Sequence, residues 1–202
     1  HHHSDYNNIV PKIFIRTDSL RQTKDVNPVR LTKNIISIEW SIAEVFAYFF
    51  KLIFSDSNVG ELFWEFSRQL GLDNQYIESI KKNFDKNFNQ FKSLNEAEMV
   101  PVVQAFFGRD VSYNGKSYGK PWTYFENELA NADRNSISLR PFVNLMKESI
   151  SQVNLNPPKA EYSEILSSNI YADDKVRQKA AEMNYDDIIK DPTAADLEIF
   201  KE

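Results

Sequence analysis

Apolar residues recur every three or four positions through the first half of the chain, which is the spacing of one helix face. The first stripe predicts a helix over residues 36–54. The second stripe consists of Val59, Leu62, Phe63, Phe66 and Leu70, followed by Gly71 as a C-terminal cap. Asp73 is placed to cap a third helix, whose apolar face holds Ile77, Ile80, Phe84, Phe88 and Phe91. Three successive amphipathic helices predict a small bundle.

Turn and cap residues divide the second half of the chain. Pro101 is predicted to open a short helix that ends at Gly108. Asn114-Gly115 lies between two short strand-like stretches, which predicts a β-hairpin. Further helices are predicted to begin at Pro121, Ser138, Tyr162, Asp173 and Asp191. The helix after Ser138 is expected to turn inward Leu139, Phe142, Val143, Met146, Ile150 and Val153.

One strand is predicted near the N-terminus, in the stretch KIFIRTDS at residues 12–19. Its apolar run, Ile13 to Ile15, has no polar face, and this is typical of a strand that is covered on both sides. The hairpin alone cannot supply neighbours on both sides. Either the strand packs on helices, or its neighbouring strands belong to a longer protein of which this chain is the C-terminal part. The many helices favour the second interpretation.

Together these elements predict a mainly α fold, a helical bundle with one N-terminal apolar strand and a short β-hairpin. Residues 1–4, which read HHHS, are interpreted as the remnant of a purification tag. The strand and the helical bundle are assigned to 9–92, and the hairpin with its following helices to 93–155. A C-terminal helical extension is assigned to 159–202.

Composition restricts the chemistry that the chain can perform. Outside the tag there is no histidine, and there is no cysteine anywhere. Histidine-assisted nucleophiles, Cys/His zinc sites and CxxC redox centres therefore lack their residues. The net charge of −5 gives no overall attraction to phosphates, so nucleic acid is not expected as a partner. Without a signal peptide or an apolar run of about 18 residues, we expect a cytoplasmic protein with no membrane contact.

The sequence NGKS at 114–117 contains the Gly-Lys-Ser that ends a P-loop, but its surroundings favour a hairpin turn. A P-loop needs glycine where this chain has Asp110, and a helix starting at the lysine, whereas no helix is predicted before Pro121. Trp40, Trp64 and Trp122 each lie on an apolar stripe and are interpreted as core residues. No metal site and no catalytic residue are predicted.

Three residues are candidates for a binding site. Arg16 and Asp18 follow the end of the apolar strand, where ligands bind in α/β sheets. Arg140 lies at the start of a predicted amphipathic helix, where a guanidinium meets the positive end of the helix dipole. An arginine there suits a phosphate group. The residues alone favour the simpler alternative, in which all three side chains face solvent.

Several segments together resemble one protein family. KIFIRTD, IEWS, FFG before the hairpin, KPWTYFENELANAD and SLRPFVNLMKESI are similar to the C-terminal half of bacterial STAND/AAA-like P-loop ATPases, over roughly residues 9–153. The resemblance implies that the strand closes a nucleotide-binding sheet. It also implies that a helical lid and a winged-helix-like module follow the strand.

The same resemblance assigns roles to the candidate residues. It makes Arg16 and Asp18 sensor residues that face the nucleotide, and Arg140 an arginine of the lid. Because no complete P-loop is present, it implies a non-catalytic lid and regulatory region. ATP and magnesium would bind only in a full-length parent, and the partner would be an upstream nucleotide-binding domain or another protein. Such parents act in signalling or phage defence.

Three other classes of protein are weighed beside this one. The main alternative is a self-contained helical domain that binds other proteins without nucleotide, and oligomers are compatible with either class. A winged-helix DNA binder is disfavoured by the negative charge. An enzyme that is active on its own is the least favoured class.

Overall fold

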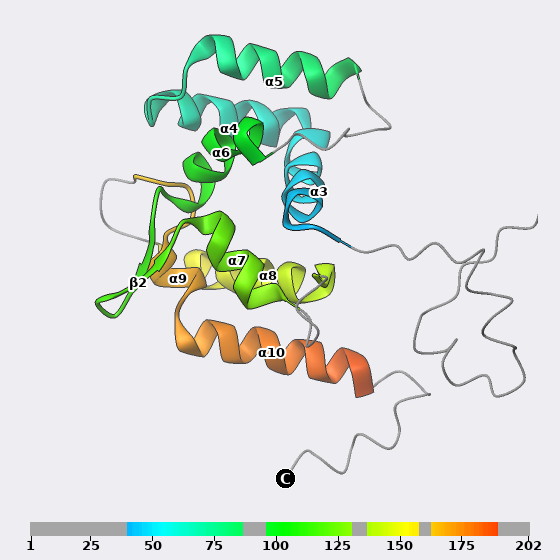
Figure 1. Ribbon diagram of the computed structural model, residues 1–202, viewed down its shortest axis with the longest axis vertical. Helices are drawn as coiled ribbons and strands as arrows, with labels where there is room; N and C mark the ends of the chain where they lie inside the picture. The colour runs from blue at the N-terminus through cyan, green and yellow to red at the C-terminus, as the bar shows by residue number, and fades with distance from the viewer. Residues whose placement is uncertain (1–39, 87–95, 131–136, 158–162, 190–202) are drawn as a thin grey trace, which may run out of the picture. The chain divides into compact units, whose positions relative to one another are not determined.

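Eight helices and one β-hairpin form the part of the chain that the computed structural model describes, residues 40–86, 96–130, 137–157 and 163–189 (Figure 1). The elements are α3 (Ile42–Ser55), α4 (Ser57–Gln69), α5 (Asn74–Lys86), α6 (Glu96–Phe107), β1 (Val111–Tyr113), β2 (Lys116–Gly119), α7 (Pro121–Leu129), α8 (Leu139–Leu155), α9 (Ser168–Tyr171) and α10 (Asp174–Ile189). This confirms the mainly α fold with a short hairpin. The predicted strand at 13–15 and the predicted helix at Asp191 lie outside the described residues. The predicted domain boundaries and the winged-helix-like module stay predictions.

Helix α3 begins six residues later than the sequence pattern predicts. Ser41 and Glu44 form a capping box, in which the Ser41 hydroxyl accepts from the Glu44 N–H and the Glu44 carboxylate accepts from the Ser41 N–H. Trp40 precedes this cap and is not helical. Its backbone instead forms a β-bridge with Ile137. Trp40 extends the apolar stripe beyond the helix because it packs against the core from an extended backbone.

Helices α4 and α5 have the caps that the sequence predicts, but α4 turns a different face inward. Gly71 has a φ of 88°, and the Asp73 carboxylate accepts from the Tyr76 N–H at the start of α5. Val59 and Leu62 were expected inward and are exposed. The buried line of α4 is Gly60, Phe63, Trp64 and Ser67. Small residues at 60 and 67 allow close packing, since a Cβ on Gly60 would lie 3.5 Å from the Phe54 Cα.

Helix α6 passes through Pro101 and begins at Glu96, so the predicted start at Pro101 is wrong. The proline removes one backbone donor from the helix interior, which normally weakens a helix. Met99, Val102 and Val103 flank it and are all buried. Burial of these side chains therefore holds together a helix that its local sequence disfavours.

The hairpin forms where Asn114-Gly115 predicts it. Both residues have positive φ, 50° and 74°, as a two-residue hairpin turn requires. Tyr113 pairs with Lys116 and Ser112 with Ser117, and an irregularity follows at Val111. Lys116 thus starts a strand and not a helix, which confirms that NGKS is a turn.

The helices after the hairpin match the predicted starts, with one exception. Pro121 is the first residue of α7, and Ser138 precedes α8. On α8, however, Ile150 is exposed, and the buried residues include Asn144, Glu148 and Ser149. The helix predicted near Tyr162 is absent from the described residues 163–167, which bend instead. The next helix, α9, starts only at Ser168.

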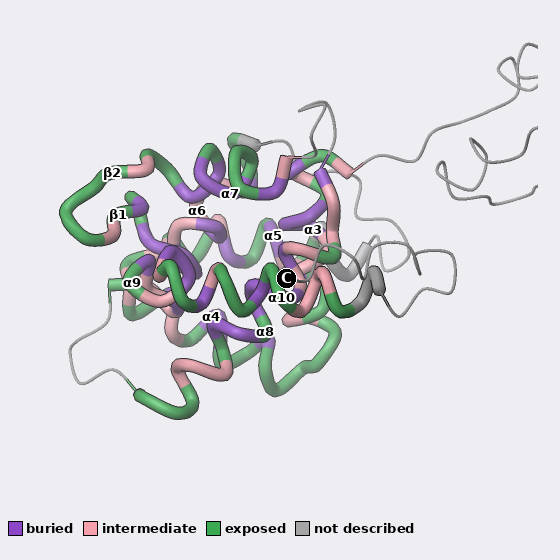
Figure 2. Tube along the Cα trace, turned by 90° about the horizontal axis from the view of Figure 1, so that it is seen from below, coloured by how far each residue is buried: buried purple, intermediate pink, exposed green. Residues whose placement is uncertain are grey.

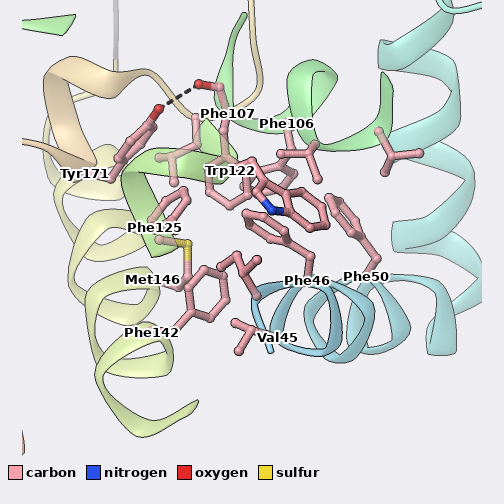
Figure 3. Close-up of a cluster of buried hydrophobic side chains, with 14 of the residues drawn as sticks. Val45, Phe46, Phe50, Phe106, Phe107, Trp122, Phe125, Phe142, Met146 and Tyr171 are labelled. Carbon is pink, nitrogen blue, oxygen red and sulfur yellow. Dashed lines mark hydrogen bonds between the residues drawn. The ribbon is translucent and has the colours of Figure 1, made fainter. Parts of the chain in front are cut away.

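The bent segment completes the C-terminal end of α6. A helix leaves its last four carbonyls without partners inside the helix. Here the Gly108 N–H donates to the Gln104 carbonyl, while the N–H groups of Ile165 and Leu166 donate to the Ala105 and Phe106 carbonyls. The Tyr171 hydroxyl donates to the fourth carbonyl, that of Phe107, at 2.8 Å (Figure 3). Distant residues therefore satisfy three of the four groups.

Buried residues recur along most of the helices (Figure 2), and aromatic rings from α3, α4, α6, α7, α8 and α9 belong to the core, whose centre is drawn in Figure 3. Phe46 of α3 lies within 5.2–6.1 Å, between ring centroids, of Phe107, Trp122, Phe125 and Phe142. Trp64 and Trp122 are buried as predicted, and Trp40 is half-buried. Among the described helices, none has the length and apolarity needed to cross a membrane.

Candidate functional site

The structure places one of the three predicted site residues. Arg16 and Asp18 lie outside the described residues. Arg140 is in the first turn of α8 and its side chain is exposed. Two residues further on, Phe142 is buried in the aromatic core, so the inner face of α8 fixes the start of the helix while Arg140 stays on the outside.

The backbone just before Arg140 is tied to the point where the N-terminal segment enters the helices. The Ile137 N–H donates to the Trp40 carbonyl at 3.2 Å, and the Ser138 N–H donates to the Leu129 carbonyl at 3.5 Å. Ile137 also forms a β-bridge with Ala130. Arg140 therefore lies one helical turn from a junction of three backbone segments.

Groups that could bind an anion are present at this helix start. The Ser138 side chain forms no capping hydrogen bond, so it leaves the first N–H groups of α8 to other acceptors. In the described ranges, no carboxylate pairs with the Arg140 guanidinium. An exposed guanidinium beside free helix N–H groups is suited to phosphate.

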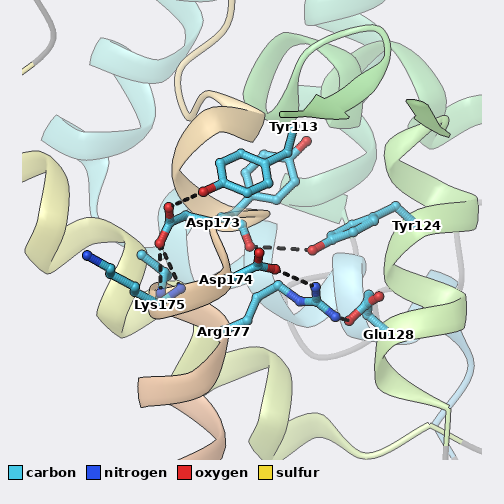
Figure 4. A network of polar contacts seen from close by, with 9 residues as sticks. Tyr113, Tyr124, Glu128, Asp173, Asp174, Lys175 and Arg177 are labelled. Atoms are coloured by element: carbon cyan, nitrogen blue, oxygen red, sulfur yellow. Dashed lines mark hydrogen bonds and ion pairs between the residues drawn. The ribbon is translucent and has the colours of Figure 1, made fainter. Parts of the chain in front are cut away.

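A second polar cluster joins the hairpin to the start of α10 (Figure 4). The Tyr113 hydroxyl donates to one Asp173 carboxylate oxygen at 2.5 Å. The other oxygen accepts from the N–H groups of Lys175 and Val176 and so caps α10. The Ser168 hydroxyl of α9 donates to the Ser112 carbonyl at 2.8 Å. One carboxylate therefore fixes both the helix start and the hairpin.

Two ion pairs connect α10 with α7 and α8. Arg177 pairs with Glu128 of α7 (Figure 4). Lys179 donates to the Glu148 carboxylate of α8 at 2.8 Å, and Gln152 donates to the same oxygen. Burial acts to raise the pKa of Glu148, but these two hydrogen bonds outweigh it and hold the pKa below its ordinary value. Glu148 is therefore a buried carboxylate that stays charged.

The chemistry of these clusters is structural. In the described ranges, every buried side-chain nitrogen and oxygen has a hydrogen-bond partner, and no group of three or more acidic or histidine residues is arranged to hold a metal ion. Sequence reasoning missed the Tyr113–Asp173 and Glu148–Lys179 pairs, although it placed a helix start at Asp173. These partners are 60 and 31 residues apart, so no local pattern connects them.

Acid should remove the contribution of Asp173 to stability. The hydrogen bond from Tyr113, with those from the α10 backbone, lowers the pKa of Asp173 below its ordinary value of 3.8. Such a carboxylate stabilises the fold above its unfolded pKa and loses this effect as the pH falls to its folded pKa. We expect Asp173→Asn to be less stable than the wild type in urea at pH 7. The difference should shrink below about pH 4.

The matched control is Asp174→Asn, at an exposed residue of the same helix. It should shift the urea midpoint little at pH 7 and at pH 3. A constant difference between Asp173→Asn and the wild type across this range would contradict the assigned role of the carboxylate.

Comparisons of the chain with protein-family models, with curated proteins and with solved structures gave no match.

Proposed function

We propose that this chain is a lid and regulatory region of a bacterial P-loop ATPase, non-catalytic by itself, in which Arg140 contacts the nucleotide phosphates. The proposal rests on the segments that resemble STAND/AAA-like ATPases and on the surroundings of Arg140. The full protein would bind ATP and magnesium in an upstream nucleotide-binding domain. It would work in the cytoplasm, in signalling or phage defence.

The position of Arg140 is the observation that carries the proposal. The exposed guanidinium lies at the positive end of the 17-residue helix α8. The backbone bond between Ile137 and Trp40 keeps this helix end next to the residue where the N-terminal segment joins the helices. In the proposal, the nucleotide-binding domain precedes that segment in the sequence.

The proposed role of Arg140 follows from its chemistry. A guanidinium can donate two parallel hydrogen bonds to phosphate oxygens, and its charge offsets the charge of the phosphate. When ATP is bound, Arg140 would favour the closed arrangement of the lid and the nucleotide-binding domain. A partner protein that binds only the closed or only the open arrangement would then respond to the bound nucleotide. Arg16 and Asp18 would act as sensor residues in the same protein.

Replacing Arg140 tests this role. In the protein that carries this chain, Arg140→Ala should weaken ATP binding by about ten- to a hundredfold, because a charged hydrogen-bonding pair contributes about 1.5–3 kcal/mol. Isothermal titration calorimetry with ATP and magnesium measures the change. The control is Lys147→Ala, which removes an exposed cation from the same helix. Equal affinities for the wild type and Arg140→Ala would contradict the role of Arg140.

The coding sequence upstream provides an independent test of the family assignment. We expect a strand, a GxxxxGK[ST] loop and a helix to precede this chain, because these parts bind the phosphates of ATP. A parent protein without this unit would exclude the ATPase assignment.

One observation favours the alternative, a helical domain that binds other proteins without nucleotide. Leu52 of α3 and Val59 and Leu62 of α4 are large apolar side chains that are about half exposed or more. Apolar surface of this kind is common in protein interfaces. The calorimetric titration separates the two proposals, because the interaction domain predicts no ATP binding in wild-type protein.

A further inference from the structure

Helix α10 is attached to the other helices mostly by polar contacts. Of its residues 174–186, the only buried ones are Val176 and Ala180, which are both small. Side-chain hydrogen bonds from Arg177, Lys179 and Asn184 reach other elements. Met183 and Tyr185 are only half-buried, so residues 174–186 gain less from the hydrophobic effect on docking than a helix with several large buried side chains.

The face of α8 beneath α10 is also polar. Helix α10 packs mainly against α8 (Figure 1). There, the Asn144 amide donates to the Asn184 side chain at 2.9 Å, and Glu148 accepts from Lys179. Asn144 and Glu148 are both buried, whereas Phe142 and Met146 of the same helix belong to the aromatic core. Water can replace the partners of an amide and a carboxylate, so exposing this face costs less than exposing core residues.

We infer that α10 is a detachable helix, which undocks from α8 as a unit while the aromatic core stays folded. The proposal rests on the polar seam formed by Asn144, Glu148, Lys179 and Asn184. Local opening of this kind is expected where few apolar contacts hold an element.

The chain also contains a suitable pivot. Asp173 caps the first turn of α10 with one oxygen, so the helix keeps its start when it leaves α8. Its other oxygen accepts from Tyr113 of the hairpin, and Tyr171 just before it is fixed to the end of α6. Movement should therefore begin after Asp173, and α9 should stay with the core.

Undocking would uncover surface next to Arg140. Asn144 lies one turn after Arg140 on α8, on the same side of the helix, and Asn184 covers it. Arg140 is already exposed with α10 docked, so undocking would change the surface beside the phosphate contact without uncovering the guanidinium itself. This consequence rests on the proposed function, whereas the undocking itself does not.

Hydrogen exchange measured by mass spectrometry, on the full chain without nucleotide, tests the inference. Backbone amides of residues 178–186 in α10 should exchange at least tenfold faster than those of 145–152 in α8, because an undocked helix of 16 residues is only marginally stable in water and its hydrogen bonds open before global unfolding. Equal protection of the two helices would show that α10 opens only with the core, which would overturn the inference.

Two sets of variants make the test specific. Lys179→Ala should accelerate exchange about fivefold in α10 and leave α6 and α8 unchanged, because it removes one tie across the seam. Lys175→Ala is the control, since this lysine is exposed and forms no ion pair with the described residues. Acceleration throughout α6 and α8 in Lys179→Ala would overturn the inference.

A cross-link between α8 and α10 should prevent undocking, which is the opposite of the effect expected for Lys179→Ala. The chain has no cysteine, so Asn144→Cys with Asn184→Cys can be joined selectively by a short thiol cross-linker. Compared with the same variant before cross-linking, exchange in α10 should slow to the rate of α8. Unchanged exchange in α10 after complete cross-linking would contradict undocking at this seam. Because no nucleotide is present, failure here leaves the proposed role of Arg140 untouched.

Discussion

Phe46→Ala should lower the free energy of unfolding by about 3–5 kcal/mol, the usual cost of removing a fully buried ring. Phe46 has no exposed surface, and four aromatic rings from α6, α7 and α8 surround it. Removal of this ring would leave a cavity between α3, α6, α7 and α8. These helices cannot all move inward at once to close it. Since small domains are stable by about 5–15 kcal/mol, much of the variant should be unfolded at moderate urea concentrations. Urea titration followed by tryptophan fluorescence measures the change.

Leu52→Ala is the control for this experiment, because it shortens an apolar side chain of the same helix that is 54% exposed. We expect a change of less than about 1 kcal/mol, as for most surface substitutions. If both variants lost the same free energy of unfolding, the loss would come from a substitution anywhere in α3 and not from removal of a ring of the aromatic core.

Tyr171→Phe should lower the free energy of unfolding by about 1–3 kcal/mol, because it leaves a buried carbonyl without a partner. The Tyr171 hydroxyl donates to the Phe107 carbonyl at 2.8 Å, and both residues are buried. Burial raises the pKa of Tyr171, so the hydroxyl remains a donor throughout the usual pH range. Phenylalanine keeps the ring and its packing, and urea unfolding therefore isolates the hydrogen bond.

Tyr124→Phe is the matched comparison. This tyrosine is equally buried, but its hydroxyl lies 3.4 Å from the Tyr171 carbonyl, which is long for a hydrogen bond. We expect a clearly smaller loss than for Tyr171→Phe. If Tyr171→Phe lost no more stability than Tyr124→Phe, the role assigned to the Tyr171 hydroxyl at the end of α6 would be contradicted.

Local signals in the sequence predict where several elements start and stop. Gly71 and Gly108 end helices with positive φ, Asp73 caps α5, and Asn114-Gly115 makes the hairpin turn. In each case the cause is a property of the residue itself or of its immediate neighbours. Such features can be recognised without knowledge of the rest of the fold.

Features that depend on distant residues were predicted wrongly. Periodicity identified α4 and α8 as amphipathic but placed Leu62 and Ile150 inward, because the inward face is decided by which side packs closely on a neighbour. Pro101 lies inside α6 because buried neighbours outweigh its local cost. The segment before α9 bends because its N–H groups donate to carbonyls of α6, which no local pattern shows.

The candidate site could be predicted only in part. Arg140 is a helix-start arginine in the sequence and in the structure. The sequence alone does not show that the backbone just before Arg140 is bonded to Trp40, since Ile137 and Trp40 are almost a hundred positions apart. The hydrogen-bonded pairs that hold α10 also join residues far apart in the sequence. In addition, a glutamate at position 148 is expected on the surface, whereas Glu148 is buried.

The completion of α6 by residues 165–171 has a consequence for how the protein is made. Synthesis proceeds from the N-terminus, so α6 exists for some time before its partners have been translated. During this interval the carbonyls of Ala105, Phe106 and Phe107 lack their final donors. The donor that the Phe107 carbonyl awaits is the Tyr171 hydroxyl. A chain stalled before residue 165 should therefore stay sensitive to protease. Folding of the end of α6 should finish only when residues 165–171 have left the ribosome.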